Sequence, residues 1–235
     1  MGYSFDSRIR YSEIGENGCL TLPGVLNYFQ DCCTFHSESI GQGMEVVKKR
    51  ERAWVLSAWQ VIVNRFPGLG EPVTVTTAPY EFRSFMGKRN FTLETKDGER
   101  LAYANSFWTY VNLSTGLPEK LSEEDTRGYE LSPKLEMDYA PRKISLPENF
   151  VSGQAFQVQK HHLDTNHHVN NCQYVCMAED YLPEGFTFRQ MRTEYKKQAR
   201  LGDVICPMVS VGEERVAVLL NNEAGEAYAA AEFTK

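Results

Sequence analysis

The feature that most constrains the fold of this 235-residue chain is an order of predicted elements that occurs twice. In the first half, a strand at 7–14 precedes a glycine-containing turn, a helix at about 22–40 and four further strands. After position 152 the order returns, with a short strand at 156–162, an irregular turn and helix at 167–182, and four more strands. A repeat of this size indicates one supersecondary unit in two diverged copies.

Three pairs of landmarks support the repeat, because each occupies the same place within its copy. They are Asn17 with Asn166, Gly70-Glu71 with Gly202-Asp203, and Gly98-Glu99 with Gly225-Glu226. The pattern of one long amphipathic helix followed by antiparallel strands is typical of an α+β fold, with the helix on one face of the sheet. The predicted strands are 53–63, 73–77, 90–95 and 101–111 in the first copy, and 189–199, 204–211, 215–221 and 227–233 in the second.

A stretch of weak periodicity, 114–153, separates the two copies. It contains four of the ten prolines, at positions 118, 133, 141 and 147, and it is too long for an ordinary loop. We therefore predict domains at 1–113 and 154–235 joined by a linker at 114–153, with one short helix capped by Ser122 within that linker.

Composition and charge exclude several classes of protein. The net charge of −6 disfavours a large nucleic-acid footprint, and no apolar run approaches the ~18 residues of a membrane span. The first residues lack the basic and apolar segments of a secretion signal, and the six cysteines form no Cys-x-x-Cys pair. We therefore expect a cytoplasmic protein with free thiols.

The polar side chains that can perform chemistry gather in the segment 163–171, just before the second predicted helix. Asp164, Asn166 and His168 bring a carboxylate, an amide and an imidazole together, and Asn170 or Asn171 is a natural N-cap. A histidine beside a helix N-terminus suits a general base next to an oxyanion hole. The competing interpretation is that such polar residues only form the turn and cap the helix.

Other chemistries lack their residues. The four clustered histidines, 161, 162, 167 and 168, match no zinc-binding spacing, and His161 and His162 are expected on opposite faces of a strand. There is no Gly-x-Ser-x-Gly elbow, dinucleotide fingerprint or phosphate loop. Cys172 and Cys176 fall within the predicted helix, where cysteine is usually a core residue. We therefore predict an activity that needs no metal or other cofactor.

The run Leu163-Asp164-Thr165-Asn166-His167-His168-Val169-Asn170-Asn171 closely resembles a segment of the acyl-acyl carrier protein (acyl-ACP) thioesterases, the plant plastid enzymes and their bacterial relatives. Glu194-Tyr195-Lys196-Lys197 and Leu201-Gly202-Asp203 resemble the next strand of that family, and Trp59, Pro67, Gly70 and Glu71 resemble its first half. The resemblance implies two hotdog folds in tandem, each a long helix wrapped by an antiparallel sheet. It also implies hydrolysis of fatty acyl-ACP to free fatty acid and carrier protein.

The same resemblance implies that Asp164, Asn166 and His168 are the catalytic residues. His168 would deprotonate water and Asn166 would orient that water or polarise the carbonyl, while Asp164 would orient the others or attack the thioester itself. The chain departs from the plant enzymes at Gln198-Ala199, where they have Glu-Cys, so a thiol or carboxylate at this site is excluded. Gln198 could still position water.

The resemblance also assigns the acyl chain to the first copy, whose own turn, Ile14-Gly15-Glu16-Asn17-Gly18-Cys19, lacks the aspartate and histidine. The candidate chain-binding residues are Trp54, Trp59, Phe107 and Trp108, together with Phe85; ordinary core packing is the alternative for each. The acidic carrier protein would dock on a basic stretch that contains Arg192, Lys196, Lys197 and Arg200.

Three further functions stay open at this level. A hotdog hydrolase could act on acyl-CoA, a hotdog dehydratase fits the motif less well, and an acyl-ligand-binding protein without activity would explain Gln198. The acyl length and the choice between monomer and homodimer are left open.

Overall fold

The computed structural model describes residues 2–235, which divide into two compact units. One unit contains residues 2–57 and 61–139, and the other contains 58–60 and 140–235. The elements of the first are β1 (Tyr3–Arg8), η1 (Tyr11–Glu13), α1 (Leu22–Ser39), α2 (Met44–Arg50), β2 (Arg52–Val63), β3 (Pro72–Arg83), β4 (Met86–Thr95), β5 (Arg100–Asn112) and α3 (Glu123–Thr126). Three residues of β2 belong to the second unit.

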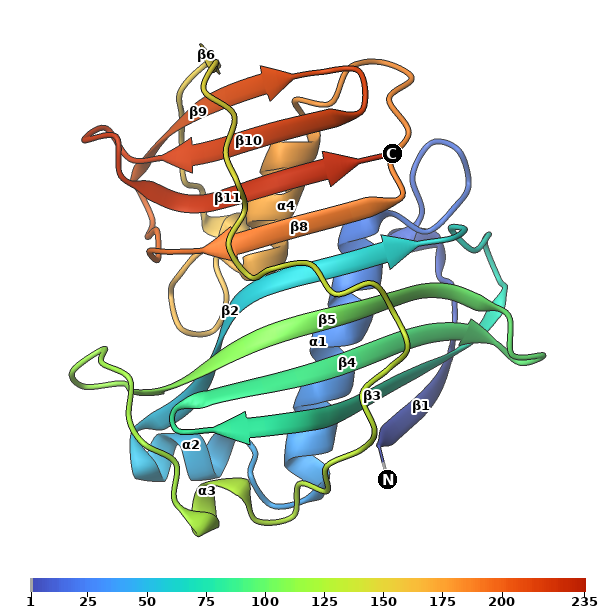
Figure 1. Ribbon diagram of the computed structural model, residues 1–235, viewed down its shortest axis with the longest axis vertical. Helices are drawn as coiled ribbons and strands as arrows, with labels where there is room; N and C mark the ends of the chain where they lie inside the picture. Colours follow the sequence, from blue (N-terminus) through green and yellow to red (C-terminus); the bar gives the residue numbers. More distant parts are fainter. Residues whose placement is uncertain (1) are drawn as a thin grey trace. The chain divides into compact units, whose positions relative to one another are not determined.

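The first unit is an antiparallel sheet in the order β1-β3-β4-β5 with α1 against it (Figure 1). Thr21 begins the helix, because its hydroxyl accepts a hydrogen bond from Gly24 N at 3.1 Å. The buried face of α1 includes Val25, Phe29 and Cys32, which recur at helical spacing. The predicted helix at 22–40 is thus confirmed within one residue.

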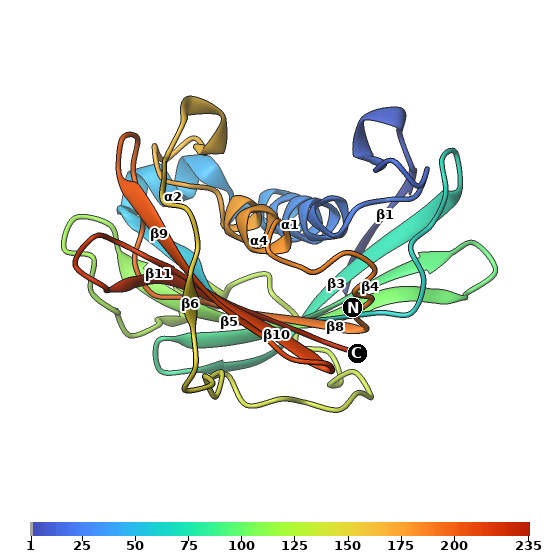
Figure 2. The ribbon, with the colours of Figure 1, turned by 90° about the horizontal axis from the view of Figure 1, so that it is seen from above.

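The two faces of this sheet carry different partners, and neighbouring residues of β4 show why. The ring of Phe91 lies 5.2 Å from that of Phe29 in α1. Asn90 points the other way, since successive side chains of a strand alternate, and its amide oxygen accepts from Leu135 N at 3.0 Å and from Tyr139 Oη at 3.0 Å. The helix therefore covers one face, and the segment that contains 135–139 crosses the other (Figure 2).

The second unit repeats this plan. Its elements are β6 (Val151–Ser152), β7 (Phe156–Gln157), η2 (Lys160–His162), α4 (Asn171–Glu179), β8 (Gln190–Tyr195), β9 (Val204–Val211), β10 (Arg215–Asn221) and β11 (Ala227–Thr234). The strands pair in the antiparallel order β8-β11-β10-β9, with β6 and β7 both on β9, and α4 lies against β10 and β11. Each unit is therefore an α+β hotdog, as the sequence predicts.

The repeat extends to individual hydrogen bonds. Gly15 N donates to Cys19 O at 2.9 Å in the first unit, and Asp164 N donates to His168 O at 2.8 Å in the second. Gly68 N donates to the Glu71 carboxylate at 3.0 Å, as Arg200 N does to that of Asp203 at 2.8 Å. The landmarks predicted from sequence thus occupy equivalent turns.

The segment between the copies is ordered against both sheets. Ser122 and Asp125 form the capping box of α3, with Ser122 N donating to the Asp125 carboxylate at 2.8 Å, which confirms the short helix. Ser132 N bonds Pro79 O at 2.9 Å within the first unit. Ile144 N bonds the Glu194 carboxylate at 3.1 Å within the second. The division between the units falls inside the predicted linker, after position 139.

The strand expected at 189–199 ends at Tyr195, and two other predicted strands are also wrong in part. The strand expected at 7–14 is already ending at Arg8, and η1 follows it. The strand expected at 156–162 ends at Gln157, and residues 160–162 form η2 instead. His161 and His162 therefore do not lie on opposite faces of a strand: their rings are in contact, with centroids 4.2 Å apart. Both strands run into turns that a local apolar pattern does not reveal.

Candidate functional site

The turn before α4 is organised by the carboxylate of Asp164. Its Oδ1 accepts hydrogen bonds from Asn166 N at 2.8 Å and from His168 N at 3.3 Å, and its Oδ2 lies 3.5 Å from Asn166 Nδ2. The three residues that the sequence singles out are therefore joined in one loop of hydrogen bonds. This arrangement fixes the backbone on which the Asn166 amide and the His168 imidazole are carried.

His167 is the residue that lets this turn close. Its φ of 61° is left-handed, a conformation that costs a residue with a Cβ about 1–3 kcal/mol. The equivalent position in the first unit is Gly18, with φ of 72°, where glycine adopts this conformation freely. The ring of His167 is exposed, so its backbone rather than its side chain defines its place in the turn.

A second segment, 199–203, is hydrogen-bonded to this turn. Val169 N donates to Ala199 O at 2.9 Å, and His168 forms an isolated β-bridge with Arg200. Ala199 is fully buried, and its N–H donates to the hydroxyl of Tyr174 in α4 at 2.9 Å. Helix, turn and segment are thus tied together around His168. Sequence reasoning missed the role of Tyr174, because its position in the apolar stripe of α4 indicates only core packing.

The surroundings of His168 favour its neutral form. Partial burial lowers the pKa of the imidazole below its usual value, and the positive charge of Arg200 lowers it further. Asp164 acts in the opposite direction but does not outweigh these two causes. A neutral imidazole is the form that can accept a proton, so the electrostatics suit a general base.

The start of α4 offers fewer free donors than the sequence suggests. Asn170 is the N-cap, with its side chain accepting from Cys172 N at 2.8 Å. Val169 N and Asn170 N donate to the carbonyls of Ala199 and His162. These three N–H groups are therefore not free to form the predicted oxyanion hole, because each already has an acceptor within the protein. The exposed Asn166 amide remains available as a donor.

Gln198 lies in the segment between β8 and the His168–Arg200 bridge, and its side chain is exposed. It directly precedes Ala199, whose carbonyl anchors the turn. The sequence position that distinguishes this chain from the plant enzymes therefore belongs to the segment that supports the site.

In the first unit, the equivalent turn has the backbone but not the side chains. Gly15 and Cys19 stand where Asp164 and His168 stand, and Asn17 corresponds to Asn166. Asn17 Oδ1 accepts from Cys19 N at 3.0 Å, which supports the turn with its own amide. One turn of the two therefore carries the carboxylate and imidazole.

A pocket of about 350 Å³, its open mouth included, lies between α1 and the sheet of the first unit. Its aromatic wall consists of Trp54, Phe82, Trp108 and Tyr129. Two of the predicted chain-binding residues, Trp54 and Trp108, thus line the same cavity. Gly87 permits the wall to form, since a Cβ there would approach the Trp54 ring to 2.9 Å.

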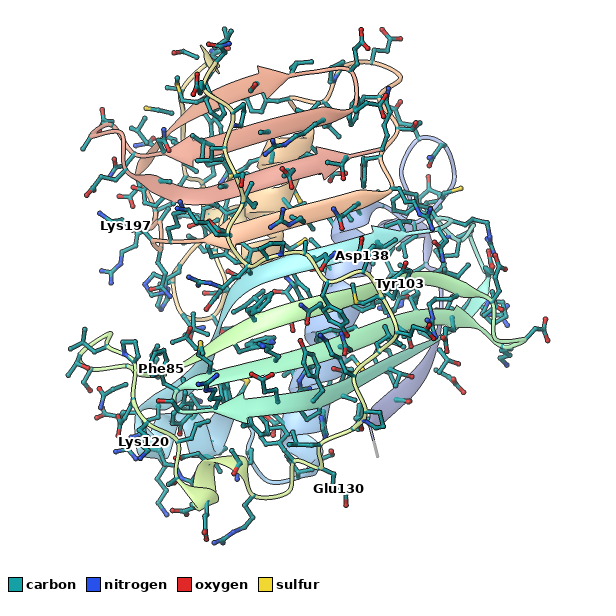
Figure 3. All side chains as sticks on the ribbon, viewed as in Figure 1. Phe85, Tyr103, Lys120, Glu130, Asp138 and Lys197 are labelled. Carbon is teal, nitrogen blue, oxygen red and sulfur yellow. The ribbon has the colours of Figure 1, made fainter. Side chains whose placement is uncertain are left out.

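The other predicted chain-binding residues lie elsewhere. Trp59 is buried in β2, with 2% of its surface exposed, and Phe107 lies under the ammonium group of Lys88, 5.9 Å from the ring centroid. Neither lines the cavity. Phe85 is 38% exposed at the turn between β3 and β4, where Figure 3 labels it.

The predicted docking residues differ in their exposure and in their ion pairs. Arg192 is largely buried, and its guanidinium pairs with Glu232 at 2.9 Å and donates to Lys143 O at 3.1 Å. Lys196 and Lys197 are exposed just after β8, where Figure 3 labels Lys197, and pair with Glu194 at 3.7 Å and Glu226 at 2.5 Å. Arg200 is exposed beside the turn that precedes α4.

The remaining predictions concern cysteines, metals and membranes. The six cysteines all lie within residues 2–235 and form no disulfide there, and burial raises the pKa of the Cys32 thiol to about 12. Within residues 2–235, no three histidine, cysteine or acidic side chains gather as a metal site would require. Across the same residues, no helix combines the length and the apolar character needed to cross a membrane.

Two hotdog units with a polar turn at the start of the second helix define the chain as a double-hotdog protein. Residues 2–129 match the model of the acyl-ACP thioesterase N-terminal domain, and residues 147–234 match that of the acyl-ACP thioesterase C-terminal domain. The chain therefore belongs to the acyl-ACP thioesterase family.

Curated relatives and solved structures agree with this assignment. The chain is 28% identical over 240 residues to a chloroplastic acyl-[acyl-carrier-protein] hydrolase of Cuphea viscosissima, covering 94% of this chain and 55% of the relative. It thus spans about half the length of the curated relatives that it matches. Its fold is similar to that of an acyl-ACP thioesterase of Bacteroides thetaiotaomicron, with a TM-score of 0.87, 22% identity and coverage of 98% and 96%. A 12:0-ACP thioesterase of Umbellularia californica gives a TM-score of 0.83, 21% identity and coverage of 99% and 96%.

Proposed function

We propose that this protein hydrolyses the thioester of fatty acyl-ACP, releasing the free fatty acid and the carrier protein. The observation that carries the proposal is the turn in which the Asp164 carboxylate fixes the backbone of Asn166 and His168. Membership of the acyl-ACP thioesterase family supports the substrate class.

The chemistry follows from the state of each group. Neutral His168 takes a proton from a water molecule as the water oxygen attacks the thioester carbonyl carbon. The exposed Asn166 amide donates to the carbonyl oxygen, where negative charge develops. The C–S bond then breaks, and the protonated imidazole returns its proton to the departing thiolate, so that the base is regenerated.

Asp164 acts in this scheme as an orienting group rather than as the nucleophile. Its Oδ1 accepts two backbone hydrogen bonds, at 2.8 and 3.3 Å, which hold the carboxylate to the turn that carries the other two residues. The negative charge also favours the imidazolium that forms during the reaction.

The acyl chain and the carrier protein would occupy different parts of the chain. The aromatic pocket of the first unit supports binding of the acyl chain there, with Trp54 and Trp108 against it. Lys196, Lys197 and Arg200 supply exposed positive charge for the acidic carrier, whereas Arg192 is committed to Glu232 and stabilises the fold. Domain boundaries at 113 and 154 and a cytoplasmic location stay predictions.

The first test is substitution at the turn. Alanine at Asp164, Asn166 or His168 should lower kcat for acyl-ACP by about 10² or more, because each change removes acid–base or electrostatic help. Release of free thiol and fatty acid is measured with purified protein, and circular dichroism checks the fold. Thr165→Ala is the matched control, since it changes an exposed side chain of the same turn. Near-normal turnover in all three variants would refute the assignment.

Two other functions are separated by the same assay. An acyl-CoA hydrolase would turn over CoA esters as efficiently as carrier-bound esters. An acyl-binding protein without activity would bind acyl-ACP and release no thiol at any pH. Gln198→Glu restores the carboxylate of the plant enzymes, so a large gain in kcat would indicate that the present residue limits the reaction.

A further inference from the structure

The pocket of the first unit contains a buried positive charge that lacks an ionic partner among residues 2–235. Arg89 of β4 lines this pocket and is only 7% exposed. Its Nη1 lies 3.2 Å from His36 Nδ1 and 3.4 Å from Thr77 Oγ1, and its guanidinium lies over the ring of Tyr129, 5.5 Å from the centroid. All three partners are neutral groups.

The neutrality of His36 follows from the same surroundings. Burial and the charge of Arg89 lower the pKa of His36 to about 4, so the imidazole carries no charge near neutral pH. The second cation of the pocket, Lys88, is already balanced by Glu81, with Nζ 3.1 Å from Oε2. The pocket therefore holds one uncompensated positive charge, at Arg89.

One edge of this guanidinium is free. Nε and Nη2 form the edge opposite to the contacts of Nη1, and neither has a hydrogen-bond partner among residues 2–235. Both atoms remain accessible from the cavity, whereas Nε of Arg52 is a fully buried donor without a partner. Two parallel N–H groups on one edge match the two oxygens of a carboxylate.

A buried charge is costly unless it is paired, so an unpaired guanidinium in a cavity indicates a place for an anion. The walls of the cavity limit what that anion belongs to. Trp54, Phe82 and Trp108 present apolar ring surface to the cavity, and small-molecule pockets are typically lined by such side chains with a few polar groups. This combination fits a single chain with an apolar body and one anionic end.

We propose that this pocket binds the carboxylate of an aliphatic acid, with the two oxygens on the Nε–Nη2 edge of Arg89 and the alkyl chain against Trp54 and Trp108. Such a carboxylate has two sources. It is either the head group of a free fatty acid or the far end of an acyl chain that carries a second carboxyl group. The binding itself does not depend on the hydrolytic activity proposed above.

Tryptophan fluorescence tests the proposal directly, because two of the three tryptophans line the pocket. Decanoate and decan-1-ol, both kept below their aggregation limits in a buffer without carboxylate, are titrated into the full chain. We expect the wild-type protein to bind decanoate more tightly than decan-1-ol. Arg89→Met should weaken decanoate binding by about tenfold to a hundredfold and leave decan-1-ol within about threefold, since it removes only the charge-assisted pair.

Arg83→Met is the matched control, because Arg83 is exposed at the end of β3 and its substitution changes the net charge by the same amount. Its affinity for decanoate should stay at the wild-type value. Equal losses for both ligands in Arg89→Met would overturn the proposal in favour of a purely apolar pocket. Equal wild-type affinities for decanoate and decan-1-ol would also overturn it, and this comparison needs no variant. A fluorescence response to coenzyme A that is lost in Arg89→Met, together with no response to decanoate, would assign the site to a phosphate instead.

The two sources are separated with pantetheine thioesters. If the ligand is a free fatty acid, decanoate should inhibit hydrolysis of decanoyl-pantetheine, and Arg89→Met should relieve that inhibition. If it is the far end of a dicarboxylic chain, Arg89→Met should lower kcat/KM for the decanedioic half-thioester more than for decanoyl-pantetheine. If the protein hydrolyses neither ester, the proposed hydrolytic function is contradicted, whereas the binding measured by fluorescence still stands.

Discussion

The charge of Arg200 reaches His168 across a single β-bridge, and it is the second cause, after burial, of the lowered imidazole pKa. Because the proposed base, His168, would work in its neutral form, kcat/KM for an acyl-pantetheine should fall only as the pH drops through this lowered pKa, below the ordinary value of about 6.5. Removing the positive charge raises the pKa, so Arg200→Gln should move the acid limb to higher pH.

The small substrate keeps this pH experiment independent of carrier docking. Lys197→Gln is its control, because Lys197 is exposed and paired with Glu226 rather than with the turn. The acid limb of the control should coincide with that of the wild type. An acid limb unchanged in Arg200→Gln would mean that His168 is not the group whose titration limits the reaction.

The backbone of residue 167 is a second feature at this scale. A β-branched side chain tolerates a positive φ worse than other residues do, so His167→Val should destabilise the protein by about 1–3 kcal/mol. His167→Gly should retain the stability and the activity, since the equivalent Gly18 forms the same turn. Urea unfolding measures the difference. Equal stability of the two variants would show that the left-handed conformation is not maintained in solution.

At the scale of elements, Tyr174 connects α4 to the segment behind the site. Its hydroxyl is the acceptor for the buried N–H of Ala199, and Tyr174→Phe would leave that group without a partner. We expect a loss of about 1–3 kcal/mol in the free energy of unfolding, which is the cost of an unsatisfied buried donor. Tyr181→Phe serves as the control, because it makes the same chemical change at the end of α4. A loss no larger than in the control would contradict the role of the hydrogen bond.

The sequence predicts the elements whose structure is set by residues close in the chain, and it misses the features that depend on distant contacts. The helix at 22–39 and the strands of both sheets follow from periodicity, and the Asp164, Asn166 and His168 cluster is visible as a polar run before a helix. The strand ends at Arg8 and Gln157 were missed because η1 and η2 carry no distinct local pattern. The pairing of Ala199 with Tyr174 and Val169 joins residues 25 or more positions apart, and the free edge of Arg89 depends on which carboxylates fold near it.

At the scale of the whole molecule, the net charge of −6 means that the proposed docking of an acidic carrier depends on local positive charge. Reversal of Lys196 or Lys197 to glutamate should raise KM for acyl-ACP, and it should matter much less for an acyl-pantetheine. Surface charges act mainly on the rate of encounter, so added salt should narrow the gap as the screening length falls below ~8 Å. The initial rates are measured at two ionic strengths.

Lys120→Glu makes the same change in net charge at an exposed position of the first unit, and Figure 3 labels it. Its KM should stay near the wild-type value if the basic segment after β8, rather than total charge, guides the carrier. A reversal at Lys196 or Lys197 that lowered kcat equally on both substrates would indicate local damage to the site, and the docking claim would then be dropped.

The paired turns give this molecule an internal standard for measuring the cost of function. Gly15–Cys19 and Asp164–His168 close with the same backbone hydrogen bond, and one carries the reactive side chains while the other does not. Hydrogen–deuterium exchange at Gly15 N and Asp164 N reports the opening of each turn in one sample, at one temperature and one pH. Once the intrinsic exchange rates of the two amides are divided out, the logarithm of the ratio of their protection factors gives the difference in opening free energy between the turn with the carboxylate and imidazole and the turn without them.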